Sequence, residues 1–201
     1  MKDEMDILKE ATSIAAGQAS IALSEIIGRR INLTMPSLQI IQSDEISKKI
    51  LPDRIVLSIN SHILSGLKGD ILFILREESA FKLVDACYKD RKETIKTGVI
   101  TEMGMSIIKE VGNIVISAYV GALSVLLKRV VIPSVFTLIS GPIDQIINMT
   151  LRTYTEKACM ILIEAAFEEP KDNIKGSFYI ILTHEAMQEI QDACKKILET
   201  L

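Results

Sequence analysis

The sequence predicts an α+β fold in which one α-β-β-β-α unit occurs twice, with a pseudo-twofold relation between the copies. Two observations support this prediction: similar blocks of residues recur in the same order in both halves, and the predicted strands are grouped between helices. This grouping favours long helices packed on a continuous, mostly antiparallel sheet. We interpret the 201 residues as a single domain built of two repeats, about 1–95 and 96–201.

Two aligned blocks reveal the repeat. In the first block, residues 7–10 match residues 107–110 at a separation of 100 positions. In the second block, the Asp-Ala-Cys sequence at 85–87 recurs at 192–194, at a separation of 107 positions. The second repeat has therefore gained seven residues in its middle. Chance produces scattered identities rather than two blocks in the same order.

Each repeat is predicted to hold the same elements. A long helix is followed by one strand, then by two strands joined by a turn-like stretch (62–69 or 169–176), and finally by a shorter helix. In the first repeat the helices cover 6–28 and 78–88, and the strands cover 30–42, 54–59 and 69–75. In the second repeat the helices cover 101–128 and 185–199, and the strands cover 130–140, 157–167 and 176–182.

The composition is that of a soluble globular protein. Hydrophobic residues make up 48% and charged residues 24% of the chain, which excludes global disorder. The net charge is −3, from 23 Lys and Arg against 26 Asp and Glu. A nucleic-acid-binding protein with a broad basic face is therefore not expected.

Location and membrane association also leave signals in the sequence. The N-terminal stretch MKDEMDILKEA carries acids and lacks a long apolar run, so no signal peptide is expected. Residues 111–127 contain no charge, but they are few for a membrane span and include polar side chains, which favours a buried core helix. The odd number of cysteines, without CxxC spacing, predicts a reducing, cytoplasmic setting without disulfides or a zinc site.

The usual hydrolase and nucleotide-binding motifs give no signal. The sequence contains no GxSxG, GxxxxGK[ST] or GxGxxG pattern. Cys87 and Cys194 occupy equivalent places in the repeats and are interpreted as small core residues. Two histidines are too few for a histidine-rich metal centre, so no metal site is expected.

One constellation on the second long helix could carry chemistry. Glu110 and Asn113 are three residues apart, and Ser106 lies four residues before Glu110, so the three side chains share one helix face. Taken alone, the pair also fits a solvated stripe on an amphipathic helix. The apolar neighbours expected to carry most of the packing are Ile107, Ile114 and Val115. In the first repeat the matching positions hold Asp6, Glu10 and Ser13.

Residues 109–114 (KEVGNI) and 117–124 (SAYVGALS) resemble the signature helix of the CheC family of chemotaxis phosphatases, which is related to CheX and FliY. The family pattern is Asp or Ser, three residues, Glu, two residues, Asn, and a later Pro. Ser106, Glu110 and Asn113 fit its first three elements. Two positions depart from it: Ser13 replaces the Asn of the first repeat, and Phe136 replaces the Pro of the second.

The resemblance implies a function and a mechanism. The substrate would be the aspartyl phosphate of the response regulator CheY, with Mg²⁺ held by the regulator and no cofactor or metal of the phosphatase's own. Glu110 and Asn113 would be the catalytic residues: Asn113 positions the attacking water, and Glu110 pairs with a lysine of the regulator. The supporting residues would be Ser106 and Asp6, and Glu10 and Ser13 would form a second, degenerate site.

Two other functions stay open at the level of the sequence. The first is a non-enzymatic binding module resembling the flagellar switch proteins. Those proteins usually carry an extra C-terminal domain, whereas this sequence ends at Leu201, just after its last predicted helix. The second is an adaptor that binds the receptor deamidase CheD, which is compatible with phosphatase activity.

Overall fold

Among the residues that the structure describes, the two halves of the chain share one order of helices and strands, except that the second half also holds α5 between β6 and β7. The computed structural model describes residues 4–34, 36–42, 55–87, 100–154 and 159–198. The first half holds α1 (Glu4–Ile27), β1 (Asn32–Leu33), β2 (Ser37–Gln42), β3 (Ile55–Ser65), β4 (Gly69–Arg76) and α3 (Glu77–Cys87). The second half holds α4 (Glu102–Leu127), β5 (Ile132–Pro133), β6 (Thr137–Pro142), α5 (Ile143–Leu151), β7 (Cys159–Glu169), β8 (Ile174–Leu182) and α6 (His184–Leu198). The predicted α+β fold is confirmed.

The eight described strands form one sheet with antiparallel pairing throughout. β4 and β8 are its central pair, with β3 beside β4 and β7 beside β8. The short strands β5 and β6 both border β3, and β1 and β2 both border β7. Equivalent strands of the two repeats therefore lie at equal distances from the centre, as a pseudo-twofold arrangement requires.

Each repeat provides border strands to the other. β2 pairs with β7, with Ser37 opposite Glu164, and β6 pairs with β3, with Thr137 opposite Asn60. Because each border strand finds its hydrogen-bonding partner in the other repeat, neither repeat can complete its part of the sheet alone. This exchange is a physical reason for regarding the chain as a single domain.

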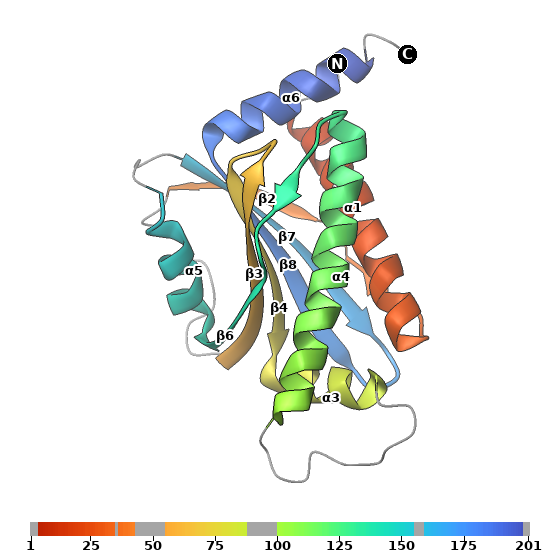
Figure 1. The fold of residues 1–201 in the computed structure, drawn as a ribbon. Helices are drawn as coiled ribbons and strands as arrows, with labels where there is room; N and C mark the ends of the chain where they lie inside the picture. Colours follow the sequence, from red (N-terminus) through yellow and green to blue (C-terminus); the bar gives the residue numbers. More distant parts are fainter. Residues whose placement is uncertain (1–3, 35, 43–54, 88–99, 155–158, 199–201) are drawn as a thin grey trace.

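Helices cover both faces of the sheet. α1 and α4 lie side by side and run in opposite directions across one face, and α5 lies against the other (Figure 1). Alternate residues of β4 point to opposite faces. Ile71 and Phe73 belong to the large core beneath α1 and α4. Leu72 and Ile74 belong to a smaller cluster beneath α5.

Local signals fix the ends of the long helices. The Thr101 side chain caps α4, because its Oγ1 accepts a hydrogen bond of 3.1 Å from the backbone N–H of Gly104. Lys128 ends α4 in the left-handed conformation, with φ of 49°. Gly28 follows α1 with φ of 69°, so both long helices end at the same place in their repeats.

α4 approaches the sheet closely at Gly112. A Cβ atom there would lie 2.7 Å from Cγ1 of Ile59 on β3, which is too close for any side chain. Glycine thus allows the backbone of α4 to rest on the sheet. The contact also determines which side of α4 faces outward, and it places Asn113 at the edge of that side.

α4 is long and apolar enough, by length and composition, to cross a membrane. In the structure its inner side packs against the sheet and α1. Its buried apolar side chains are Ile108, Val111, Val115, Ile116, Tyr119, Val120, Leu123 and Leu127. These contacts agree with the predicted core helix.

Several element predictions need correction. β3 continues to Ser65, so His62 lies in a strand opposite Asp70 and not in a turn over 62–69. The chain reverses at Gly66, which has φ of 90°. Each of the single strands predicted over 30–42 and 130–140 is two strands, and both members border the same neighbour.

α5 is not among the predicted elements. It lies between β6 and β7, where four of the seven extra residues arise, because the separation of equivalent positions rises there from 100 to 104. Its buried residues are Ile143, Ile146, Ile147, Thr150 and Leu151. This spacing of three, one, three and one is that of an amphipathic helix, so the signal for α5 was present in the sequence.

Candidate functional site

The predicted polar stripe of the second repeat lies on the outward side of α4. Ser106 and Glu110 are exposed, and Asn113 is half-buried. The three positions span two helical turns. The Ser106 hydroxyl donates a hydrogen bond of 3.0 Å to the backbone carbonyl of Glu102, one turn earlier. The Glu110 carboxylate and the Asn113 amide are therefore both presented where a docking protein could contact them.

The Asn113 side chain is held by its own helix. The Ser117 hydroxyl donates to Asn113 Oδ1 over 3.3 Å, across one turn of α4. Within the described part of the chain, Asn113 Nδ2 makes no hydrogen bond. The amide is thus oriented but not fully satisfied, unlike the amide of an asparagine that serves only to stabilise a core.

One packing prediction for α4 is wrong. Val115 is fully buried and Ile107 is half-buried, but Ile114 is 40% exposed. Ile114 lies four residues after Glu110 and therefore shares the outward face of the helix. The close contact at Gly112 fixes this rotation of α4, and Ile108 contributes the packing expected of Ile114.

The first repeat presents a matching stripe on α1. Asp6 and Glu10 are exposed and Ser13 is half-buried, as are Ser106, Glu110 and Asn113 at the equivalent places of α4. α1 and α4 pack along each other in opposite directions (Figure 1). Each stripe lies in the N-terminal half of its helix, so the two stripes lie toward opposite ends of the helix pair. The structure does not bring their carboxylates together into one site.

The proline position of the family pattern has the same structural role in both repeats. Pro36 is buried directly before β2, and Phe136 packs half-buried on the core directly before β6. The strands that follow, β2 and β6, pair with β7 and β3 in equivalent registers. Phe136 therefore leaves the path of the following strand unchanged.

The equivalence of the two registers can be read from the strand partners. β3 and β7 correspond at a separation of 104 residues, since Ile55 begins the one and Cys159 the other. Asn60 therefore corresponds to Glu164. Ser37 lies opposite Glu164 and Thr137 lies opposite Asn60, so β2 and β6 meet their neighbours at the same point.

The described residues offer little for metal binding or thiol chemistry. Across the described ranges, no group of three or more His, Cys, Asp or Glu side chains could hold a metal ion. Cys87 packs half-buried against the large core, in agreement with its interpretation as a core residue.

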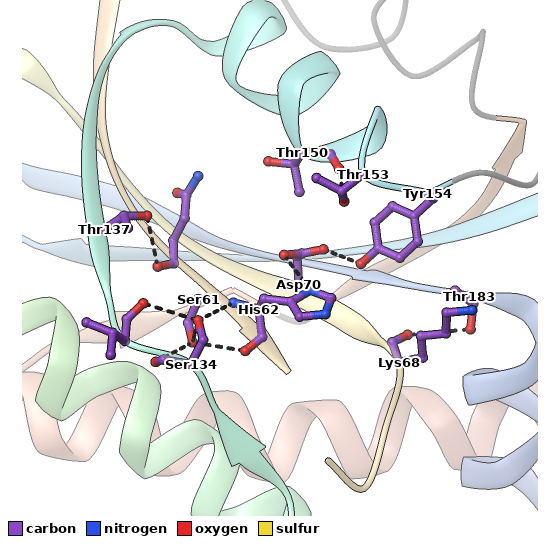
Figure 2. A network of polar contacts seen from close by, with 12 residues as sticks. Ser61, His62, Lys68, Asp70, Ser134, Thr137, Thr150, Thr153, Tyr154 and Thr183 are labelled. Atoms are coloured by element: carbon purple, nitrogen blue, oxygen red, sulfur yellow. Dashed lines mark hydrogen bonds and ion pairs between the residues drawn. The ribbon is translucent and has the colours of Figure 1, made fainter. Parts of the chain in front are cut away.

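A second polar cluster, missed at the level of the sequence, lies on the sheet face opposite α4 (Figure 2). His62 Nδ1 lies 3.2 Å from Asp70 Oδ1, across the β3–β4 pair. The Tyr154 hydroxyl, just beyond α5, donates to Asp70 Oδ2. The extension of β3 past the predicted turn brings His62 and Asp70 together, which explains why the sequence did not reveal the cluster.

Burial dominates the electrostatics of this cluster. Loss of hydration raises the pKa of the Asp70 carboxyl, and the hydrogen bond from Tyr154 partly offsets that rise. Burial and the neighbouring Asp70 carboxyl also raise the pKa of the Tyr154 phenol. The cluster connects the chain after α5 to the β3–β4 hairpin. Both oxygens of the Asp70 carboxyl have a partner within the cluster, one in His62 and the other in Tyr154.

Comparison with known proteins relates this fold and the α4 stripe to one family. Residues 103–135 match the CheC-like family, and this segment contains Ser106, Glu110 and Asn113. The protein is 23% identical over 193 residues to the CheY-P phosphatase CheC of Bacillus subtilis (strain 168), covering 94% of this chain and 92% of that protein. The resemblance to the CheC family predicted from the sequence is confirmed.

Solved structures share the fold. FliY of Thermotoga maritima matches with a TM-score of 0.74 and 21% identity, covering 98% of each chain. The middle domain of FliM from Vibrio alginolyticus matches with a TM-score of 0.61 and 15% identity, covering 93% of this chain and 99% of that one. The architecture is thus shared with FliY and with the middle domain of FliM.

Proposed function

We propose that this protein is a phosphatase that hydrolyses the aspartyl phosphate of the response regulator CheY. The outward Glu110–Asn113 pair, within the segment that matches the CheC-like family, is the observation that supports this proposal most directly. The similarity to the CheY-P phosphatase CheC, along nearly the whole of both chains, supports the choice of substrate. The substrate is a cytoplasmic protein, and we place this protein in the same compartment.

The reaction requires little chemistry from the phosphatase. A water molecule attacks phosphorus, the bond between phosphorus and the aspartyl oxygen breaks, and inorganic phosphate and a free aspartate result. The regulator would hold the Mg²⁺ that offsets the negative charge of the phosphoryl group. Catalysis then depends on the position of the water, as in other phosphoryl transfers.

Asn113 is the residue that we assign to the water. Its amide oxygen accepts a hydrogen bond from the water, and its NH₂ group donates to a second acceptor, without bringing negative charge near the phosphoryl group. The half-buried position of Asn113 on a rigid core helix suits this task, because a displaced water loses its alignment with phosphorus.

Glu110 would hold the regulator in place. It is exposed one turn before Asn113, where its carboxylate can pair with a lysine of the docked partner. Ser106 would be a supporting residue of the α4 stripe, and Asp6 would be one of the α1 stripe. Ser13 is shorter than asparagine by the amide group, so the α1 stripe could bind a regulator through Glu10 but would position the water poorly.

The alternative is a binding module without activity, which the structural likeness to the FliM middle domain favours. A further alternative is an adaptor for the deamidase CheD. Both differ from the phosphatase in what they do to the phosphorylated regulator, because binding alone does not shorten the life of the aspartyl phosphate.

The test is the decay of purified, phosphorylated CheY in Mg²⁺ buffer with and without this protein. The proposal predicts faster decay at substoichiometric protein. If the protein binds phosphorylated CheY and leaves its decay rate unchanged, the binding-module alternative is correct. Co-purification with CheD, measured in parallel, tests the adaptor role independently.

A further inference from the structure

We infer that Ser117 is a positioning residue for Asn113. This inference rests on the proposed function, and it adds a residue outside the Ser106, Glu110 and Asn113 pattern. Ser117 is exposed on α4, one turn beyond Asn113, and its hydroxyl donates to Asn113 Oδ1 over 3.3 Å. It is the one described side chain that hydrogen-bonds the Asn113 amide.

The orientation of the amide matters because the two edges of an asparagine side chain differ. The oxygen accepts hydrogen bonds and the nitrogen donates them, yet rotation about χ2 exchanges their places at little cost. The hydrogen bond from Ser117 selects one of the two orientations. The oxygen has two lone pairs, so one accepts from Ser117 and the second stays available for the water.

The two repeats differ at both positions of this pair. α4 has Asn113 and Ser117, whereas α1 has Ser13 and Gly17 at the equivalent places. α1 therefore lacks the amide and also the hydroxyl that would orient it. A Cβ atom at Gly17 would meet nothing within 4 Å, so the missing side chain can be added without steric conflict.

This difference yields a sharper expectation than the loss of the amide alone. Ser13→Asn restores an amide on α1 but leaves it without its orienting partner. The double variant Ser13→Asn/Gly17→Ser restores both. Ser13→Asn/Gly17→Ala is the matched control, because alanine also removes the helix-weakening glycine but supplies no hydroxyl.

The first experiment measures kcat and KM for phosphorylated CheY with Ser117→Ala and Ser117→Thr. We expect Ser117→Ala to lower kcat about tenfold with little change in KM, since a misplaced amide slows the reaction without weakening docking. Ser117→Thr, which keeps the hydroxyl, should restore most of kcat. A rise in KM alone, or equal kcat for Ser117→Ala and wild type, would overturn the inference.

The second experiment places the α1 variants in an Asn113→Ala background. We expect Ser13→Asn/Gly17→Ser to hydrolyse faster than Ser13→Asn/Gly17→Ala by about tenfold. Equal rates of the two double variants would refute the orienting role even if Ser117→Ala proves unstable. Failure of wild type to accelerate decay is a separate outcome that rejects the proposed function itself, and with it this inference.

Discussion

At the scale of single residues, Glu110 and Asn113 are expected to contribute differently to the reaction. Glu110 is fully outward on α4 and would contact the regulator, whereas half-buried Asn113 would contact the water. We predict that Glu110→Gln raises KM about tenfold and weakens the dependence of KM on salt, because it removes one charge of a docking pair. Steady-state kinetics at two ionic strengths measures both effects. An unchanged KM with a lowered kcat would assign Glu110 to the chemical step instead.

Tyr119 offers a stability test at the same scale. Its hydroxyl is buried in the core without a hydrogen-bond partner among the described residues, and burial raises the pKa of the phenol. We predict that Tyr119→Phe keeps or increases the free energy of unfolding, by up to about 1 kcal/mol, because the unsatisfied hydroxyl is removed while the ring remains. Urea denaturation measures the change. A loss of more than about 1 kcal/mol would reveal a partner for the hydroxyl.

Asp70 makes stability depend on pH. Its pKa is raised in the folded state, chiefly by burial, so folding favours the protonated carboxyl. The contribution of Asp70 to stability is present below its unfolded pKa, near 4, and is lost as pH rises through the folded pKa. Asp70→Asn should therefore flatten the fall in melting temperature above pH 4 relative to wild type. If plots of melting temperature against pH are parallel for wild type and Asp70→Asn, Asp70 is not the source of the pH dependence.

At the scale of elements, two glycines of α4 make a matched pair. A Cβ atom at Gly112 would press on Ile59, whereas one at Gly121 would meet nothing within 4 Å. We predict that Gly112→Ala destabilises the protein by about 1–3 kcal/mol through overpacking. Gly121→Ala should stabilise it by about 0.5–1 kcal/mol through helix propensity. Equal effects in urea denaturation would show that α4 is not seated on β3 at Gly112.

The elements also show what the sequence could and could not reveal. The long helices followed from apolar spacing, and the repeat located their equivalent residues. The outward orientation of the Ile114 side chain was missed because it depends on the contact between Gly112 and Ile59, which lie far apart in sequence. The His62–Asp70 pair was missed because the extent of β3 depends on pairing with β4 rather than on local turn residues.

At the scale of the whole molecule, the exchange of border strands makes the repeats interdependent. β2 completes the sheet of the second repeat, and β6 completes that of the first. We predict that fragments 1–95 and 96–201 each fail to fold when produced separately and assemble when mixed. Circular dichroism and size-exclusion chromatography of the single and mixed fragments measure this. A cooperatively folded, monomeric single fragment would contradict the exchanged arrangement.

The exchange itself was beyond the reach of the sequence. Repetition predicted two equivalent units and one continuous sheet, but local patterns do not specify which strand borders which. The family pattern likewise identified the α4 stripe, whereas the contact between Ser117 and Asn113 required coordinates.

The central claim is that the α4 stripe, through Asn113, carries the phosphatase activity. The most direct measurement is the decay rate of phosphorylated CheY with wild type, Asn113→Ala, Glu10→Ala and Ser13→Asn, each confirmed as folded by circular dichroism. We predict that Asn113→Ala falls about a hundredfold below wild type, that Glu10→Ala stays near it, and that Ser13→Asn equals or exceeds it. Full activity of Asn113→Ala together with loss of activity in Glu10→Ala would contradict the claim and assign the reaction to α1.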